Sequence, residues 1–145
     1  MKKGLIALMT VLMALFLSFP LTAEASNEDD VLSYINAQRE AAGVPLLAMD
    51  EDLQAVAAIR AQECSVSFSH TRPNGQAWYT VSKLTGGENL AHAINFNQQK
   101  PENVVTAWML SPKHSANVVR ERFTVVGISY YCNDKGETFI ACEFR

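Results

Sequence analysis

The chain has 145 residues, of which 48% are hydrophobic, with a formal net charge of −3 at pH 7 and three cysteines. This length suits one domain with a single core. The sequence contains no basic block, which argues against nucleic acid and against anionic membrane surfaces as partners. No C-x-x-C pair occurs, so a thioredoxin-type motif and a zinc ribbon are excluded.

Residues 1–25 have the features of a secretory signal peptide. Two lysines precede the almost wholly apolar residues 4–21, and Ala23-Glu24-Ala25 is a small-x-small cleavage signal. A membrane-spanning helix is the competing interpretation, since the apolar run is long enough, but the cleavage signal and the acidic residues after it favour removal. Removal would take away two lysines and one glutamate, so the formal charge of −3 becomes −4. Residues 26–145 are then expected to form one exported domain with no stable membrane span.

Two helices are predicted next along the chain. The first covers residues 27–42, where acidic residues suit the positive end of the helix and Gly43 ends it. Asp50 is a plausible N-cap for the second. Its narrow apolar stripe comprises Leu53, Val56, Ala57, Arg60, Ala61 and Cys64. The alanines in this stripe allow another layer to approach closely.

The second half of the chain alternates between short elements of both kinds. A short helix, a strand and a polar loop are predicted at residues 76–84, 88–94 and 95–100, followed by helices that start at Pro101 and after Ser111. Residues 123–131 and 137–144 are predicted to form a hairpin. Three or four helices with a small antiparallel sheet indicate the α+β class.

The three cysteines leave two interpretations open. An oxidising compartment permits one disulfide among Cys64, Cys132 and Cys142. A hairpin loop of residues 133–136 would place Cys142 opposite Gly127, so Cys132 and Cys142 are not expected to bridge directly. A disulfide from Cys64 to one strand cysteine remains open, and so does the alternative that all three are buried thiols.

His70, Glu88 and His114 are the main candidates for chemistry. Two neutral imidazoles and one carboxylate are a sufficient ligand set for Zn²⁺ or another divalent metal, with water in the open position. If Ser111 caps its helix, His114 is the third helical residue, where the positive helix end disfavours imidazolium. The sequence separations of 18 and 26 residues lack the short spacing of a strong metal motif. Spacing alone therefore favours scattered surface or capping roles.

Four motifs occur in one order along the chain. They are FSHTRPNG at residues 68–75, GENLA at 87–91, AWMLSPKHSANV at 107–118 and FTVVGISYY at 123–131. Together they resemble the CAP superfamily of secreted proteins (SCP/PR-1-like), especially its bacterial branch. The resemblance covers residues 30–144. It implies a three-layer α-β-α sandwich with a small antiparallel sheet and a secreted, extracellular protein.

The resemblance also implies a central cleft that typically carries two histidines and two glutamates. His70, Glu88 and His114 match three of these positions, and Ser111 stands where the second glutamate is expected. Losing one carboxylate is expected to weaken metal binding relative to the full set. His92 lies outside the matched positions, so we treat it as incidental.

Three functional hypotheses follow from this site. The leading one is an exported module whose cleft binds a small-molecule, lipid or protein ligand, with divalent-metal binding through His70, Glu88 and His114. The second is a metal-assisted hydrolase of peptides or esters, in which Glu88 serves as base or ligand to a metal-bound water. In the third, His–Glu hydrogen bonds only brace the loops.

Overall fold

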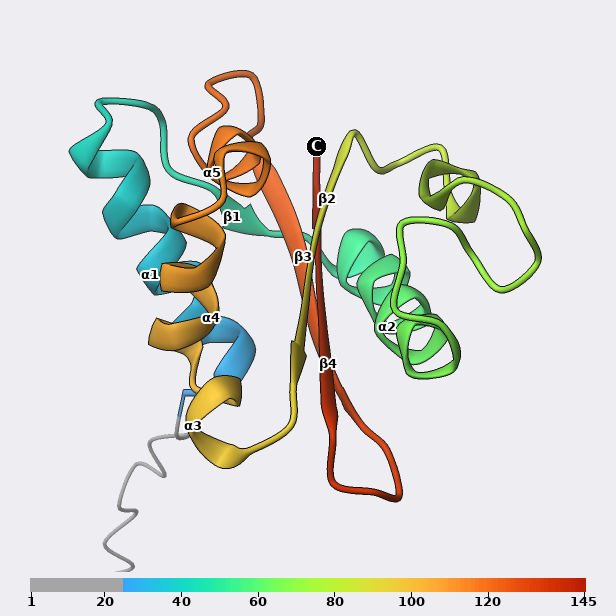
Figure 1. The fold of residues 1–145 in the computed structure, drawn as a ribbon. Coiled ribbons are helices and arrows are strands. Elements are labelled where there is room, and N and C mark those ends of the chain that lie inside the picture. The colour runs from blue at the N-terminus through green and yellow to red at the C-terminus, as the bar shows by residue number, and fades with distance from the viewer. Residues whose placement is uncertain (1–24) are drawn as a thin grey trace, which may run out of the picture.

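The computed structural model describes residues 25–145, so the predicted signal peptide, residues 1–25, lies outside the described residues except for Ala25. The described chain forms three layers around a central sheet (Figure 1). One face carries α1 (Asn27–Ala41), α3 (Phe96–Gln99), α4 (Pro101–Met109) and α5 (Pro112–Val118), and the other carries α2 (Glu51–Val66) with the short 3-10 helix η1 (Trp78–Val81). The predicted α-β-α sandwich is confirmed. Within residues 25–145, no helix is long and apolar enough to cross a membrane.

Side-chain caps fix where the two long helices begin. At α1, the Ser26 hydroxyl accepts a hydrogen bond from the Asp29 amide at 3.2 Å, and the Asp29 carboxylate accepts one from the Ser26 amide at 3.3 Å. The Asp50 carboxylate accepts the Leu53 amide at 2.9 Å and starts α2. Such bonds satisfy amide groups that have no partner inside the helix. The apolar stripe predicted on α2 is buried along its whole length.

The sheet is mixed rather than purely antiparallel. Its strand order is β1-β3-β4-β2, with β1 (Ala48–Met49), β2 (Gly87–Ala93), β3 (Val125–Cys132) and β4 (Thr138–Phe144). β1 pairs parallel to β3, whereas β2 and β3 each pair antiparallel to β4. The prediction missed β1, because a strand of two residues is too short to show any periodic pattern.

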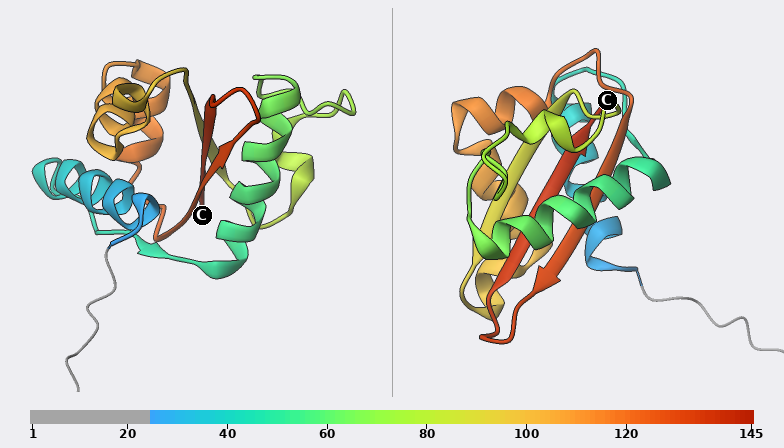
Figure 2. Two further views of the ribbon diagram at one scale, coloured as in Figure 1. Left: turned by 90° about the horizontal axis from the view of Figure 1, so that it is seen from below. Right: turned by 90° about the vertical axis from the view of Figure 1, so that its right-hand side faces the viewer.

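Strand β4 lies at the centre of the molecule, and its alternating side chains divide the core in two. Ile140, Cys142 and Phe144 pack with α1 and α4, whereas Phe139 and Ala141 pack against α2. The two further views in Figure 2 show α2 crossing its face of the sheet. Gly127 on β3 permits this crossing, because a Cβ atom there would lie 2.0 Å from the backbone carbonyl carbon of Leu53.

Strand β2 lies at the edge of the sheet, and side chains from α4 and α5 bond to its backbone. The indole Nε1–H of Trp108, on α4, donates to the Leu90 carbonyl at 2.9 Å. The Asn117 amide, on α5, donates to the Glu88 carbonyl at 3.3 Å. Both bonds occupy backbone oxygens of β2, so the position of this strand is tied to α4 and α5.

The register of the predicted hairpin is wrong by one residue. Cys142 pairs with Ile128 and not with Gly127. The loop runs over residues 133–137, one residue longer than expected, because the Asn133 side chain accepts the amide of Glu137 at 3.0 Å and closes a wider turn.

Two other local predictions also need correction. The segment predicted as a polar loop at residues 95–100 contains α3, which Asn95 caps by accepting the Gln98 amide at 3.0 Å. The helix predicted at residues 76–84 is only the single turn η1. Both elements are too short for an apolar stripe, which was the signal used to find the other helices.

No disulfide forms among the three cysteines, all of which are free. Cys64 and Cys142 are buried on opposite faces of the sheet, since Cys64 packs with Ala61 and Ala141 whereas Cys142 packs in the α1–α4 layer. Cys132 is exposed at the end of β3. Of the two interpretations left open by the sequence, buried free thiols hold for Cys64 and Cys142.

Candidate functional site

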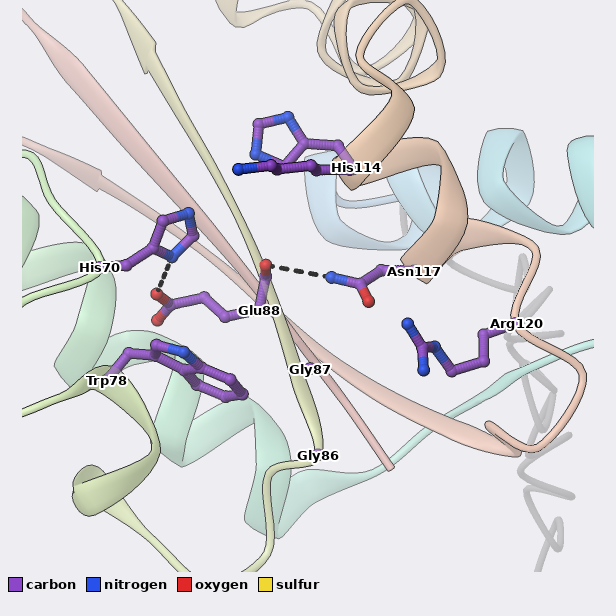
Figure 3. A pocket seen from close by; sticks show the side chains of 9 residues that line it. His70, Trp78, Gly86, Gly87, Glu88, His114, Asn117 and Arg120 are labelled. Atoms are coloured by element: carbon purple, nitrogen blue, oxygen red, sulfur yellow. Dashed lines mark hydrogen bonds and ion pairs between the residues drawn. The ribbon is translucent and has the colours of Figure 1, made fainter.

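The predicted residues His70, Glu88 and His114 meet in one pocket of about 450 Å³. The pocket lies at the beginning of β2, between the two helical layers (Figure 3). His70 follows α2, whereas His114 belongs to α5 in the opposite layer. The remaining lining residues are Trp78, Gly86, Gly87, Lys113, Asn117 and Arg120. The three side chains thus converge as expected, and their chemical role stays a prediction.

The Glu88 carboxylate is paired with Arg60 beneath the pocket. Arg60 Nε lies 2.6 Å from Glu88 Oε2, its Nη2 lies 3.3 Å from Oε1, and both side chains are fully buried. Burial alone would raise the pKa of Glu88, but hydrogen bonds from His70 and Arg60 outweigh it and lower that pKa. Glu88 is therefore ionised, and the Arg60 guanidinium cancels its charge.

Arg60 also fixes the segment that carries His70. Its guanidinium donates to the Ser69 carbonyl at 2.8 Å and to the Glu63 carboxylate at 2.5 Å. Arg72 contacts the same carboxylate at 2.6 Å. Because α2 supplies both Arg60 and Glu63, it anchors the turn on either side of the histidine.

The His70 ring is oriented by Glu88 and points into the pocket. Its Nδ1 lies 2.7 Å from Glu88 Oε1, and half of the side chain, 51%, is exposed. Since the carboxylate is ionised, Nδ1 is the donor. In the neutral ring, Nε2 then carries the lone pair. The backbone amide of Trp78 donates to the His70 carbonyl at 2.9 Å, and Figure 3 shows the Glu88 carboxylate between the imidazole and the indole.

A second buried carboxyl group, Glu143, lies behind Glu88. The two residues are paired across β2 and β4, and Thr85 Oγ1 donates to Glu143 Oε2. Glu143 Oε1 has no other partner and is buried. Burial and the neighbouring Glu88 carboxylate raise the pKa of Glu143 well above its usual value. The environment of Glu143 therefore favours the protonated, uncharged form of its carboxyl group.

His114 forms the opposite wall of the pocket. Its ring centroid lies 6.4 Å from that of His70, and its backbone carbonyl accepts the Asn89 side-chain amide at 3.0 Å. Burial and, secondarily, His70 lower the pKa of His114. Ser111 precedes the helix, as predicted, but its side chain makes no capping hydrogen bond and does not line the pocket.

Metal binding by His70, Glu88 and His114 stays a prediction. Both oxygens of Glu88 are engaged by Arg60 and His70. Within residues 25–145, no group of three or more His, Cys, Asp or Glu side chains could hold a metal ion. The imidazoles of His70 and His114 are potential metal ligands. Glu88 would then orient the His70 ring through its hydrogen bond.

The sequence reasoning missed several residues of this site. Arg60 was placed in an apolar stripe, and a charged residue at a core position is itself a signal that a buried partner must exist. Glu143 carried a similar signal within a strand of apolar residues. Lys113 and Arg120 line the pocket but gave no signal, because exposed cations are common on any helix surface. His92 lies away from the pocket, stacked on Phe139 with ring centroids 4.5 Å apart.

Comparison with known proteins places this architecture among described domains. The profile of the cysteine-rich secretory protein family (CAP) matches residues 32–144. The chain is 32% identical over 131 residues to YkwD of Bacillus subtilis (strain 168), a match that covers 77% of this chain and 49% of that protein. The chain thus spans about half the length of this relative.

Two solved structures show the same fold. An extracellular protein containing a SCP domain from Bacillus anthracis str. Ames has a TM-score of 0.67 and 22% identity, covering 81% of this chain and 39% of that chain. An outer surface protein from Borrelia burgdorferi has a TM-score of 0.66 and 21% identity, and the match covers 83% of this chain and 94% of that chain. The layered fold and its cleft define a CAP-type domain. The chain belongs to the cysteine-rich secretory protein family (CAP).

Proposed function

We propose that this CAP domain is secreted and acts as a ligand-binding module through the pocket of His70, Glu88 and His114. The apolar N-terminal segment with its cleavage signal supports export. So do two structural relatives, which are described as an extracellular protein and an outer surface protein. The ligand is held between the two helical layers.

The buried Arg60–Glu88–His70 arrangement carries this proposal. Burying an ion pair is costly unless good hydrogen bonds compensate it. Here the pair fixes one exposed imidazole at the pocket surface by a bond of 2.7 Å. Pre-organised side chains reduce the entropy that is lost when a ligand binds. Loop bracing, the third hypothesis, describes part of what these bonds do but does not account for the open pocket.

Divalent-metal binding is a weaker part of the proposal. It would rest on the imidazoles of His70 and His114 with solvent as further ligands, so we expect a lower affinity for Zn²⁺ than a three-ligand site provides. A calorimetric zinc titration of the wild type and of a His70→Ala, His114→Ala variant tests it. Equal heats from both proteins would remove metal binding from the proposal.

The hydrolase alternative would need a base other than Glu88. A carboxylate whose pKa is lowered by a buried guanidinium is a weak base. Both of its oxygens are also engaged. We therefore propose binding, and not hydrolysis, as the function.

Tryptophan resonances allow a direct test of ligand binding. The chain has two tryptophans, Trp78 in the pocket and Trp108 buried in the core. In ¹H–¹⁵N spectra, we expect a member of a panel of oligosaccharides, fatty acids and peptides of differing charge to shift the Trp78 indole resonance. The Trp108 resonance should not move and serves as the internal control. If no member shifts pocket resonances, the proposed function is wrong.

A further inference from the structure

A second hollow continues the pocket beyond Gly86. It has a volume of about 300 Å³, and Gly86 lines both hollows. Its other lining residues are Lys83, Leu84, Thr85, Arg122, Phe123 and Arg145. The two hollows therefore adjoin at Gly86, just before the start of β2. We call them together the basic groove.

Positive charge gathers along this groove although the predicted mature chain is acidic overall. Lys113 and Arg120 line the first hollow, and Lys83, Arg122 and Arg145 line the second. Within residues 25–145, only Arg145 of these five forms an ion pair, with Asp50 at 2.6 Å. The other four side chains have no carboxylate within salt-bridge distance in the described chain.

The acidic groups near the groove do not cancel this charge. Glu88 is neutralised by Arg60 at 2.6 Å, and Glu143 is fully buried with a raised pKa. Glu121 is exposed but lines neither hollow. The groove thus presents uncompensated cations to solvent, which is the arrangement expected of an anion-binding surface.

The backbone beneath these cations is held rigidly. The fully buried guanidinium of Arg39, on α1, donates to the carbonyls of Val118 at 2.8 Å, Arg120 at 3.0 Å and Phe123 at 2.8 Å. The guanidinium carbons of Arg120 and Arg122 each lie 5.4 Å from the centroid of the Phe123 ring. The buried Phe123 ring therefore lies close to one arginine from each hollow, Arg120 from the first and Arg122 from the second.

Glycine at positions 86 and 87 lets the Phe123 ring pack closely where the two hollows meet. A Cβ atom at Gly87 would lie 2.9 Å from the Phe123 ring and 3.3 Å from Asn117 Oδ1, and a Cβ atom at Gly86 would lie 3.4 Å from the same ring. The Phe123 and Asn117 side chains thus fill the space above Gly87. A ligand that occupies both hollows would lie over these packed side chains.

We propose that the basic groove binds an acidic polysaccharide, with charged groups in both hollows and a sugar ring against Trp78. This inference rests on the proposed function, because it names the ligand of the same pocket. An indole offers a flat apolar face of the kind that packs on ring-shaped ligands. A thin, flexible chain of spaced anions suits two connected hollows, whereas a nucleic acid duplex is too wide to enter a pocket of about 450 Å³.

Galacturonate oligomers provide a probe with one carboxylate on each sugar. Their fully methyl-esterified form has the same backbone without charge and is the matched control. Binding is followed by the fluorescence of Trp78, and a Trp78→Phe variant shows which tryptophan responds. We expect the acid form to bind, the ester to bind at least about tenfold more weakly, and the affinity to fall as salt increases.

Charge-reversed variants locate the binding surface. Lys113→Glu tests the first hollow and Arg122→Glu tests the second, and each should weaken a long oligomer about tenfold. Lys135→Glu makes the same change of charge on the exposed β3–β4 turn at the far end of the molecule (Figure 1) and should have little effect. A galacturonate dimer carries fewer charges than a long oligomer, so it should be less sensitive to Arg122→Glu.

Three outcomes would overturn the inference. The first is an equal loss of affinity in all three charge-reversed variants, and the second is equal binding of acid and ester. The third is tighter binding of a single-stranded oligothymidylate than of the galacturonate oligomer. If neutral ligands shift Trp78 while acidic ones do not, ligand binding as a function survives and only the acidic class is wrong.

Discussion

At the scale of single residues, Glu88 has the most demanding environment in the pocket. Its carboxylate accepts bonds from Arg60 and His70 while it is fully buried. Glu88 therefore connects two parts of the site. It holds the guanidinium that anchors α2 to the histidine turn, and it fixes the tautomer of the exposed imidazole.

Replacement of Glu88 should therefore cost stability as well as binding. In Glu88→Gln, Arg60 keeps its charge and its contact with the Glu63 carboxylate at 2.5 Å but loses the Glu88 carboxylate, so we expect the free energy of unfolding to fall by about 1–3 kcal/mol. Urea denaturation followed by circular dichroism measures the change. Glu121→Gln, on an exposed residue, is the matched control and should change little. A loss below about 1 kcal/mol in Glu88→Gln would contradict a buried ion pair.

Glu143 gives a prediction about pH. The folded protein keeps a proton on Glu143 that the unfolded chain releases above about pH 4.3. This group therefore stabilises the fold less as the pH rises towards its raised folded-state pKa. In Glu143→Gln the side chain is uncharged at every pH, so the stability of the variant relative to the wild type should increase with pH over that range.

Parallel urea titrations of the two proteins from about pH 4 to about pH 8 measure this relative stability. The prediction concerns the difference between variant and wild type, so the titration of groups that do not interact with Glu143 cancels. A difference that stays constant, or that falls with pH, would show that Glu143 is ionised in the folded protein.

At the scale of secondary structure, the sequence predicted most helices and strands because their ends are chemically marked. Asp50 caps α2 as predicted, and Pro101 and Pro112 begin α4 and α5. The predictions were wrong where an element has few residues or where the length of a loop can vary. β1 has two residues, and the hairpin register depends on how the Asn133 side chain closes its turn.

The candidate site was predicted only in part for a related reason. Motif order gave His70, Glu88 and His114, which do line one pocket. Arg60 and Glu143 could not be paired with Glu88 from sequence alone, since they come from α2 and β4. Their proximity depends on the crossing of α2 over the sheet, which local patterns do not encode.

That crossing depends on Gly127. A Cβ atom there would overlap the backbone of Leu53, and a backbone cannot rotate away as a side chain can. Gly127→Ala should therefore lower the free energy of unfolding by about 3 kcal/mol and displace α2 together with Arg60. Thermal unfolding with a Ser129→Ala control, two residues along the same strand, tests this prediction. A melting temperature equal to that of the wild type would contradict it.

At the scale of the whole molecule, the sheet separates the two buried thiols, and the environment of each sets its reactivity. Burial raises the pKa of Cys64 to about 11 and that of Cys142 well above its usual value. Cys132 alone is exposed. The thiolate is the reactive form of cysteine, so the two buried side chains should be inert in the folded protein.

Thiol counting with a chromogenic disulfide reagent tests this arrangement. We expect one thiol to react in the native protein and three to react in denaturant without any reductant. The Cys132→Ser variant should lose the native reaction only. A count of one in denaturant would show that two of the cysteines form a disulfide after all.

The bonds from Trp108 and Asn117 to strand β2 also bear on how the protein behaves at high concentration. An uncovered edge strand is a template for pairing with another chain. Here an indole and a carboxamide occupy the outward carbonyls of Leu90 and Glu88. The helices α4 and α5 thus cover part of this sheet edge, which hinders pairing of β2 with a second molecule. Variants that lose either side chain should open a route to fibrous aggregation as well as weaken the pocket.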